Sequence, residues 1–233
     1  MWNTKRTGLM LAVALAITGG LWAQHHERGM NPMADIPSFG LQNPTVGSGS
    51  EYLITTAKGK EIDMSTVAMG TETVEGEPGY WMETRMPSAE LGGETVMKNL
   101  VVSSGAQPGV KRMIMQAPGR PPMEMGGFMM NMMKQHEKPP ITPSAGGANT
   151  GMGELIGTES VTVPAGTFDC KHYRKTNARG TTDFWISTDV TPYAMVKMTG
   201  PDMTMVLKKV LSNESTHIVG EPQKMEMPQM PKF

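Results

Sequence analysis

Methionine is the residue type whose abundance first suggests chemistry in this sequence. The chain has 233 residues, of which 25 are Met, five are His and one is Cys. Thioether sulfur is a soft ligand that suits Cu(I), and the densest methionine group lies between two proline pairs. That group, with one histidine, consists of Met123, Met125, Met129, Met130, Met132, Met133 and His136, and Met225, Met227 and Met230 follow near the C-terminus. The sequence therefore supports a hypothesis of copper binding.

Core packing is the alternative explanation for these methionines. Methionine far outnumbers leucine, and it stands in β-like runs where Leu or Val normally serves: Met64, Met69, Met82, Met97, Met113, Met115, Met195, Met198, Met203 and Met205. An unbranched thioether side chain fills irregular apolar space and adapts to varied ligands. We favour packing over metal binding for most of these residues.

A second copper hypothesis concerns the N-terminus that export would create. Cleavage after Ala23 leaves Gln24, His25 and His26 as the first three residues. The free amine, two deprotonated backbone amides and the third residue's imidazole can form a square-planar site, which suits Cu(II) or Ni(II). An N-terminal glutamine tends to cyclise, however, and cyclisation blocks the amine.

The single cysteine gives a weak indication of enzymatic chemistry. Cys170 and His172 are two residues apart in a β-like run, so both point to one face. A nucleophile also needs a base, an orienting group and an oxyanion device, and the sequence shows no such set. We interpret Cys170 as a small buried side chain. No glycine-rich loop joins a strand to a helix, so we expect neither an enzyme nor a cofactor.

The N-terminal residues have the plan of a secretory signal peptide. Lys5 and Arg6 precede the apolar stretch 7–18, and a short segment then leads to Ala23. An uncleaved anchor is the alternative, but this stretch is shorter than the roughly 20 apolar residues that a spanning helix needs. We therefore expect residues 1–23 to be removed, leaving a periplasmic or secreted protein with no transmembrane anchor.

The charge balance bears on the class of partner. Lys and Arg number 21 and Asp and Glu number 22, which gives a formal charge of −1. Binding to nucleic acid depends on neutralising many phosphates, so nucleic acid is not an expected partner.

The remaining chain alternates short β-like runs with turn residues. Residues 24–50 have no periodicity and are expected to form an irregular leader, and 220–233 a flexible tail. The runs are 51–57, 60–69, 79–86, 94–103, 109–117, 154–163, 167–176, 181–187, 193–199 and 202–211, with 216–219 as a short edge strand. In 202–211, alternation places Met203, Met205 and Leu207 on one face together with Lys209. In 79–86, Tyr80 and Met82 oppose Trp81.

One segment has helical rather than β periodicity. Its apolar stripe consists of Met125, Phe128, Met129, Met132, Met133 and His136, at helix spacing. The pattern predicts an amphipathic helix at about 125–137, which needs an apolar surface to pack against.

The C-terminal half resembles a known group of proteins. The stretch from Val161 to Cys170, the tripeptide Trp185-Ile186-Ser187 and the tripeptide Met195-Val196-Lys197 are similar to exported bacterial proteins of the DUF3108/DUF4412 type. Those proteins are in turn similar to the LolA/LolB-like periplasmic carriers of lipoproteins and lipids. The resemblance implies an incomplete antiparallel barrel wrapped over helices, with an apolar cavity between them.

These observations lead to one predicted fold and three functional hypotheses. We expect a mainly β domain over 51–219, a curved antiparallel half-barrel with helix 125–137 on its concave side. Its cavity would bind an apolar or lipid-like ligand through Tyr80, Met82, Met113, Met115, Phe128, Met129, Met132, Trp185, Met203 and Met205. The alternatives are a copper-binding protein using His25, His26, Met130, Met133 and His136, and a structural or interaction domain of the cell envelope whose cavity the helix fills.

Overall fold

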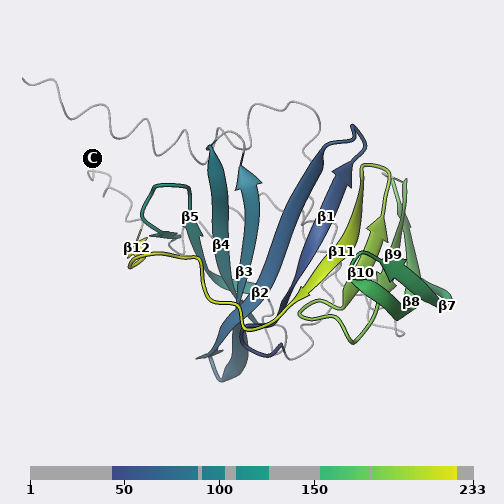
Figure 1. The fold of residues 1–233 in the computed structure, drawn as a ribbon. Coiled ribbons are helices and arrows are strands. Elements are labelled where there is room, and N and C mark those ends of the chain that lie inside the picture. Colours follow the sequence, from purple (N-terminus) through teal and green to yellow (C-terminus); the bar gives the residue numbers. More distant parts are fainter. Residues whose placement is uncertain (1–43, 89–90, 103–108, 126–152, 179, 225–233) are drawn as a thin grey trace, which may run out of the picture. The chain divides into compact units, whose positions relative to one another are not determined.

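The computed structural model describes residues 44–88, 91–102, 109–125, 153–178 and 180–224. All of them belong to one compact unit, Ser38–Phe233. They form twelve strands in a single sheet (Figure 1). The strands are β1 Gly49–Thr56, β2 Glu61–Val74, β3 Glu77–Ser88, β4 Gly93–Val102, β5 Gly109–Gln116, β6 Met123–Glu124, β7 Glu154–Val163, β8 Gly166–Asn177, β9 Gly180–Ile186, β10 Met195–Thr199, β11 Met203–Leu211 and β12 Gln223–Lys224.

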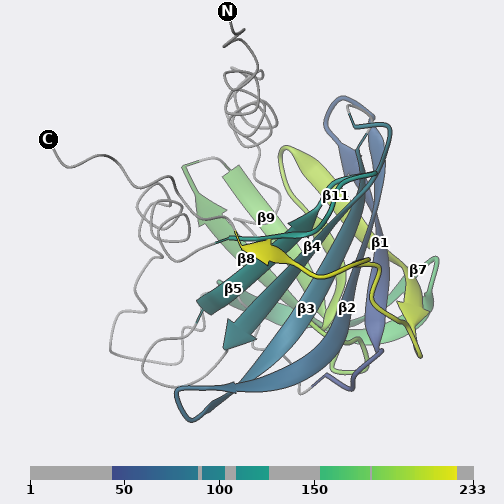
Figure 2. The same cartoon turned by 90° about the vertical axis from the view of Figure 1, so that its left-hand side faces the viewer.

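Two antiparallel meanders make up the sheet. The strand order is β12-β6-β5-β4-β3-β2-β1-β11-β10-β9-β8-β7, so β1 to β6 form one meander and β7 to β11 the other. Figure 2 shows β2, β3, β4 and β5 following one another across the first meander. Pairing of β1 with β11 joins the two halves, and only the two-residue β12 pairs in parallel, with β6. The predicted mainly β fold, with a large and mostly antiparallel sheet that is not closed, is confirmed.

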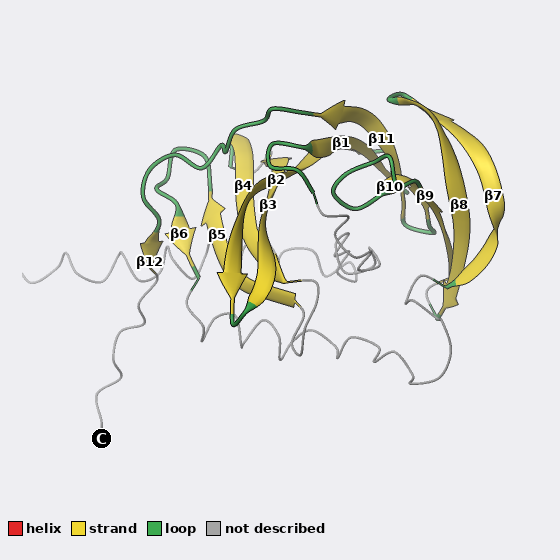
Figure 3. Cartoon of the chain, turned by 90° about the horizontal axis from the view of Figure 1, so that it is seen from below, coloured by secondary structure: helices red, strands yellow, loops and turns green. Residues whose placement is uncertain are grey.

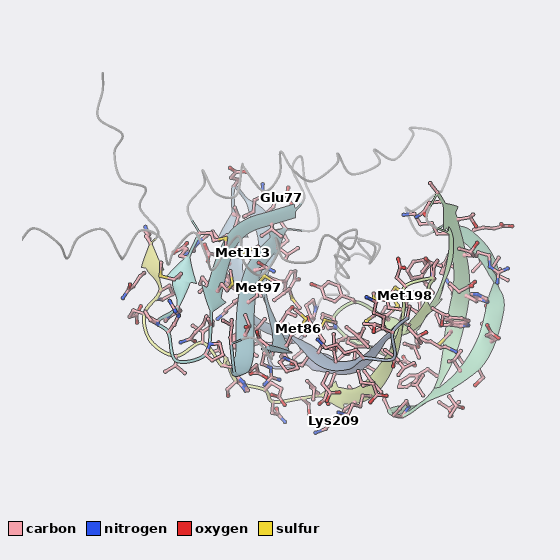
Figure 4. All side chains as sticks on the ribbon, turned by 90° about the horizontal axis from the view of Figure 1, so that it is seen from above. Glu77, Met86, Met97, Met113, Met198 and Lys209 are labelled. Carbon is pink, nitrogen blue, oxygen red and sulfur yellow. The ribbon has the colours of Figure 1, made fainter. Side chains whose placement is uncertain are left out.

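The sheet is curved, which gives it two different faces (Figure 3). Met97, Met113 and Met198 point to the concave side and Lys209 to the convex side (Figure 4). We call the first the inner face and the second the outer face. Because directly paired residues share a face, the strand registers assign the other side chains.

The core lies on the inner face where the two meanders join. Tyr52 of β1 pairs with Met64 and Leu207, and Met198 pairs with Met205 and Phe184. All six side chains are at most 4% exposed. The Tyr52 hydroxyl donates a hydrogen bond to the Met195 carbonyl at 3.1 Å, so this buried phenol is satisfied.

The outer face is also partly covered, by the chain that follows β11. The backbone N–H of Glu214 donates to the Gly47 carbonyl at 3.0 Å, and the Gly47 N–H donates to Ala68 of β2 at 2.7 Å. Val67 and Leu100 on the outer face are fully buried. Residues 212–222, which we call the strap, leave β11 and lead to β12 (Figure 1).

Several predictions about individual elements need correction or lie beyond the description. The run 216–219 is not a strand but part of the strap. Lys209 does not share the face of Met205, because a register shift opposite Glu51 and Tyr52 turns it outward to pair with Glu51. Gln223 and Lys224, in the expected flexible tail, form β12. The predicted helix 125–137 lies outside the described residues except for Met125, as does the signal peptide.

Candidate ligand-binding face

Three neighbouring strands of the first meander present methionines on the inner face. In register across β3, β4 and β5, Thr84 lies beside Met97 and Met115, and Met82 lies beside Asn99 and Met113. Tyr80 lies beside Val101 in the next inner row. This arrangement follows from period-two alternation in each strand. We call the inner positions of β3, β4 and β5 the methionine face.

The side chains of the methionine face differ in how far they can be reached. Met82 is 1% exposed and Met113 is 8% exposed, so both are covered. Met86, Met97, Met115 and Tyr80 are half-buried. Met113 and Met125 form a buried cluster against which Met97, Val110 and Met115 pack. The face therefore has an apolar floor with flexible thioether side chains above it.

Among the described residues of the inner face, three buried side-chain oxygen atoms have no hydrogen-bond partner. They are the Thr66 and Thr95 hydroxyl oxygens and the Asn99 side-chain carbonyl oxygen, all of them buried. Asn99 lies in register between Met82 and Met113, so its direct neighbours across the sheet offer no donor. Leaving a buried polar group unpaired costs about 1–3 kcal/mol, and native proteins rarely contain such groups. These three atoms are therefore positions on the inner face where a bound water or a ligand group can make a hydrogen bond.

Charged residues of these strands that have a register partner lie on the opposite, outer face. Glu83 pairs with Lys98 in register, and Arg112 pairs with Leu100. Arg112 donates from Nε to Glu124 Oε1 at 2.7 Å and lies 5.0 Å from the centre of the Trp81 ring. The inner register positions of β3, β4 and β5, in contrast, hold only uncharged side chains. The register positions of the methionine face therefore carry no charge, and Lys111, at the irregularity in β5, lies 3.8 Å from Glu75.

The structure brings together some of the predicted ligand-binding residues and separates others. Tyr80, Met82, Met113 and Met115 share the methionine face. Met203 and Met205 are also on the inner face but in β11, at 8% and 2% exposure within the core. The remaining predicted ligand or metal residues Phe128, Met129, Met130, Met132, Met133, His136, His25 and His26 lie outside the described residues.

Trp185 does not line the inner face. It pairs in register with His172 and Lys197 on the outer face, whereas its neighbour Phe184 points into the core. The Trp185 ring stacks on His172 with centroids 4.5 Å apart, and Lys197 Nζ lies 4.8 Å from its centre. Its indole N–H donates to Glu159 at 2.6 Å. Trp185 is thus fully engaged in a surface cluster.

The same outer cluster contains a carboxylate with a perturbed pKa. Asp183 Oδ1 lies 2.7 Å from His172 Nε2 and 2.8 Å from Arg174 Nε. Burial raises the pKa of Asp183, but the hydrogen bonds from Arg174 and His172 outweigh it, so the net pKa lies below the ordinary value. Stabilisation of a surface sheet explains this arrangement without any catalytic role.

Cys170 is buried and protonated at neutral pH. Its side chain has no exposed surface, and burial raises the thiol pKa to about 11, with smaller contributions from Asp169 and Glu159. Only the thiolate is an effective nucleophile. The His172 ring, two positions along β8, is bound to Asp183 and Glu159 instead.

The sequence did not single out Asn99, Thr95 and Thr66, and alternation within one strand does not identify them as binding residues. Alternation in 94–103 places Thr95, Met97 and Asn99 on one face, but its other face is equally mixed, with Lys98 between Val96 and Leu100. Only the register against β3 and β5 shows that Asn99 lies among methionines.

The described part of the chain lacks two features, a metal-binding cluster and a membrane-spanning helix. No three His, Cys, Asp or Glu side chains there are arranged to hold a metal ion. That part also lacks any helix with the length and apolarity needed to cross a membrane.

The chain is similar to solved structures of exported bacterial proteins only at low sequence identity. No protein-family model matches the chain, and no curated protein sequence matches it significantly. A solved structure described as a "putative lipoprotein" from Parabacteroides distasonis is 15% identical, with a TM-score of 0.37, covering 73% of this chain and 98% of its own. A "putative exported protein with YmcC-like fold" from Bacteroides fragilis is 14% identical, with a TM-score of 0.34, covering 72% of this chain and 96% of its own.

Proposed function

We propose that this protein is a non-enzymatic exported protein that binds an apolar or amphiphilic ligand on the methionine face. The observation that carries the proposal is the set of half-buried methionines there, Met86, Met97 and Met115, on the same face as the half-buried Tyr80. Flexible, polarizable side chains over a buried apolar floor suit ligands of variable shape. The unpaired atoms of Thr95 and Asn99 add the few polar groups that ligand sites also contain.

Export and the lack of catalysis are part of the same proposal. The sequence of residues 1–23 supports export through a cleaved signal peptide. The raised pKa of Cys170 and the engagement of His172 by carboxylates argue against a nucleophilic pair. Cell fractionation and mass spectrometry of the mature N-terminus check export. The expected first residue of the mature protein is Gln24.

Ligand binding is tested on protein purified from its own cell envelope. Native mass spectrometry of this protein comes first, and solvent extraction and lipid analysis follow. We expect an extractable apolar ligand and saturable uptake of a fluorescent acyl probe. Met97→Gln and Met115→Gln place polar groups on the methionine face and should weaken uptake. Leu53→Gln, at a half-buried outer position of β1, is the matched control and should leave uptake unchanged. If the purified protein carries no ligand and takes up no probe, the proposal is contradicted. The remaining explanation is then a structural or interaction domain.

Copper binding is the second candidate function because several methionine side chains, each with a thioether sulfur, pack against one another. Met97, Met113, Met115 and Met125 pack together on the inner face, and three or four sulfur atoms suit Cu(I). The triple substitution of Met97, Met113 and Met115 by Leu keeps the apolar volume and removes the sulfur ligands. Loss of Cu(I) binding with retained acyl-probe uptake favours a metal site, whereas equal Cu(I) affinity in both proteins excludes it.

A further inference from the structure

Asn99 shows what kind of ligand fits the methionine face. Its side-chain carbonyl oxygen is buried and unpaired, and it lies in register between Met82 and Met113. An amide carbonyl oxygen can only accept a hydrogen bond, so the missing partner must be a donor. The Thr95 hydroxyl oxygen, four residues earlier in β4, is also unpaired and can donate or accept.

The absence of charge at these register positions narrows the chemical class of the ligand further. Charged side chains of β3, β4 and β5 such as Glu83, Lys98 and Arg112 lie in outer positions, and the inner register positions carry none. A charged group placed among apolar side chains without a counter-charge is strongly disfavoured. A carboxylate or phosphodiester beside Asn99 would have no cation in a neighbouring register position, and an ammonium group would have no carboxylate there.

We propose that the ligand is a neutral amphiphile whose polar end carries a hydroxyl or amide N–H group, and that Asn99 accepts a hydrogen bond from it. This inference rests on the proposed ligand-binding function and specifies its chemistry. The apolar part lies on Met86, Met97 and Met115, and the hydroxyl of Thr95 gives a second polar contact. Long-chain alcohols and monoacylglycerols belong to this class, whereas ionised fatty acids do not.

Competition with a fluorescent acyl probe tests this ligand class, using competitors that share the same hydrocarbon chain and differ in their polar end. The competitors are hexadecanol, monopalmitoylglycerol, palmitate and hexadecyltrimethylammonium, at neutral pH and below their aggregation concentrations. The alcohol and the glyceride should bind at least about tenfold more tightly than either charged ligand, the ratio that one hydrogen bond commonly gives. Palmitate binding as tightly as hexadecanol overturns the inference while leaving the proposed function intact. Failure of all four ligands to compete contradicts both the inference and the proposed ligand-binding function.

Asn99→Leu provides a second and independent measurement. Removing an unpaired polar atom from an apolar surface should leave the ligand-free protein as stable as wild type or more stable, in urea unfolding. The preference for the alcohol over palmitate should disappear in this variant. Leu53→Gln, at a half-buried outer position of β1, is the control and should retain the preference. A marked loss of stability in Asn99→Leu would mean that Asn99 already has a protein partner, and the inference would then fail.

Discussion

The buried carboxylate of Glu83 accepts a hydrogen bond from the backbone N–H of His217, 134 residues later in the chain, at 2.9 Å. Its second oxygen accepts from the Thr216 hydroxyl. Glu83 has no exposed surface, and a buried carboxylate is tolerated only when its oxygens are satisfied. The strap therefore supplies the hydrogen bonds that a carboxylate in the middle of β3 requires.

Replacing this carboxylate should loosen the strap. Glu83→Gln keeps the side-chain volume but turns two hydrogen bonds to a charged group into weaker neutral ones, which we expect to cost about 1–2 kcal/mol of unfolding free energy. Urea denaturation measures the loss, and limited proteolysis should show faster cleavage within 212–222. Glu61→Gln, at an exposed position, is the control and should change neither result. Unchanged proteolysis in Glu83→Gln would show that the strap is held by other contacts.

Methionine acts as the core residue in β11, and its replacement by leucine should be mild. Met205 is 2% exposed and pairs with Ile54 and Met198. Met205→Leu should cost less than about 1.5 kcal/mol because it nearly conserves volume. Met205→Ala should cost about 2–5 kcal/mol because it leaves a cavity. Thermal and urea unfolding of both variants test this, and similar losses in the two would mean that the sulfur itself is important.

Alternation predicted the strands and many of the faces correctly. In β3, Tyr80 and Met82 lie opposite Trp81, as the sequence indicates. The runs were recognisable because turn residues separate them, and a strand's side-chain period does not depend on its partners. The mainly β class followed from these local signals alone.

The features that sequence missed depend on contacts between distant strands. The turn of Lys209 to the outer face results from an irregular register against β1, which nothing in 202–211 encodes. Trp185 was placed on the inner face because adjacent Phe184 and Trp185 are both apolar, and alternation alone does not decide between them. Asn99 was not singled out, because both faces of β4 mix apolar and polar residues and only the register against β3 and β5 places Asn99 among methionines.

The Asp183 cluster should make a small contribution to stability at neutral pH. Because hydrogen bonds lower the folded-state pKa of Asp183, its contribution is present above the unfolded value of about 3.9 and is lost as pH falls through the folded value. Arg174 is 46% exposed, so solvent limits the effect to about 1 kcal/mol or less. Asp183→Asn should therefore be less stable than wild type at pH 7, and the difference should shrink in strong acid. A difference independent of pH would contradict this assignment.

Alkaline pH should destabilise the fold through the buried phenol of Tyr52 and the half-buried phenol of Tyr193. Burial raises the pKa of Tyr193 to about 12 and raises that of Tyr52 further, and Tyr52 also donates to Met195 at 3.1 Å. Both phenols hold their protons more tightly in the folded protein than in the unfolded chain. Their contribution to the free energy of unfolding is therefore intact below the unfolded pKa of about 10 and is lost as pH rises above it.

Tyr52→Phe should cost about 1 kcal/mol of unfolding free energy at pH 7 for the lost hydrogen bond. This deficit should shrink at about pH 11 because phenylalanine does not ionise. Phe184→Leu, a core change without a phenol, should keep its deficit over the same range. Parallel stability curves for wild type and Tyr52→Phe would show that ionisation of Tyr52 does not limit alkaline stability.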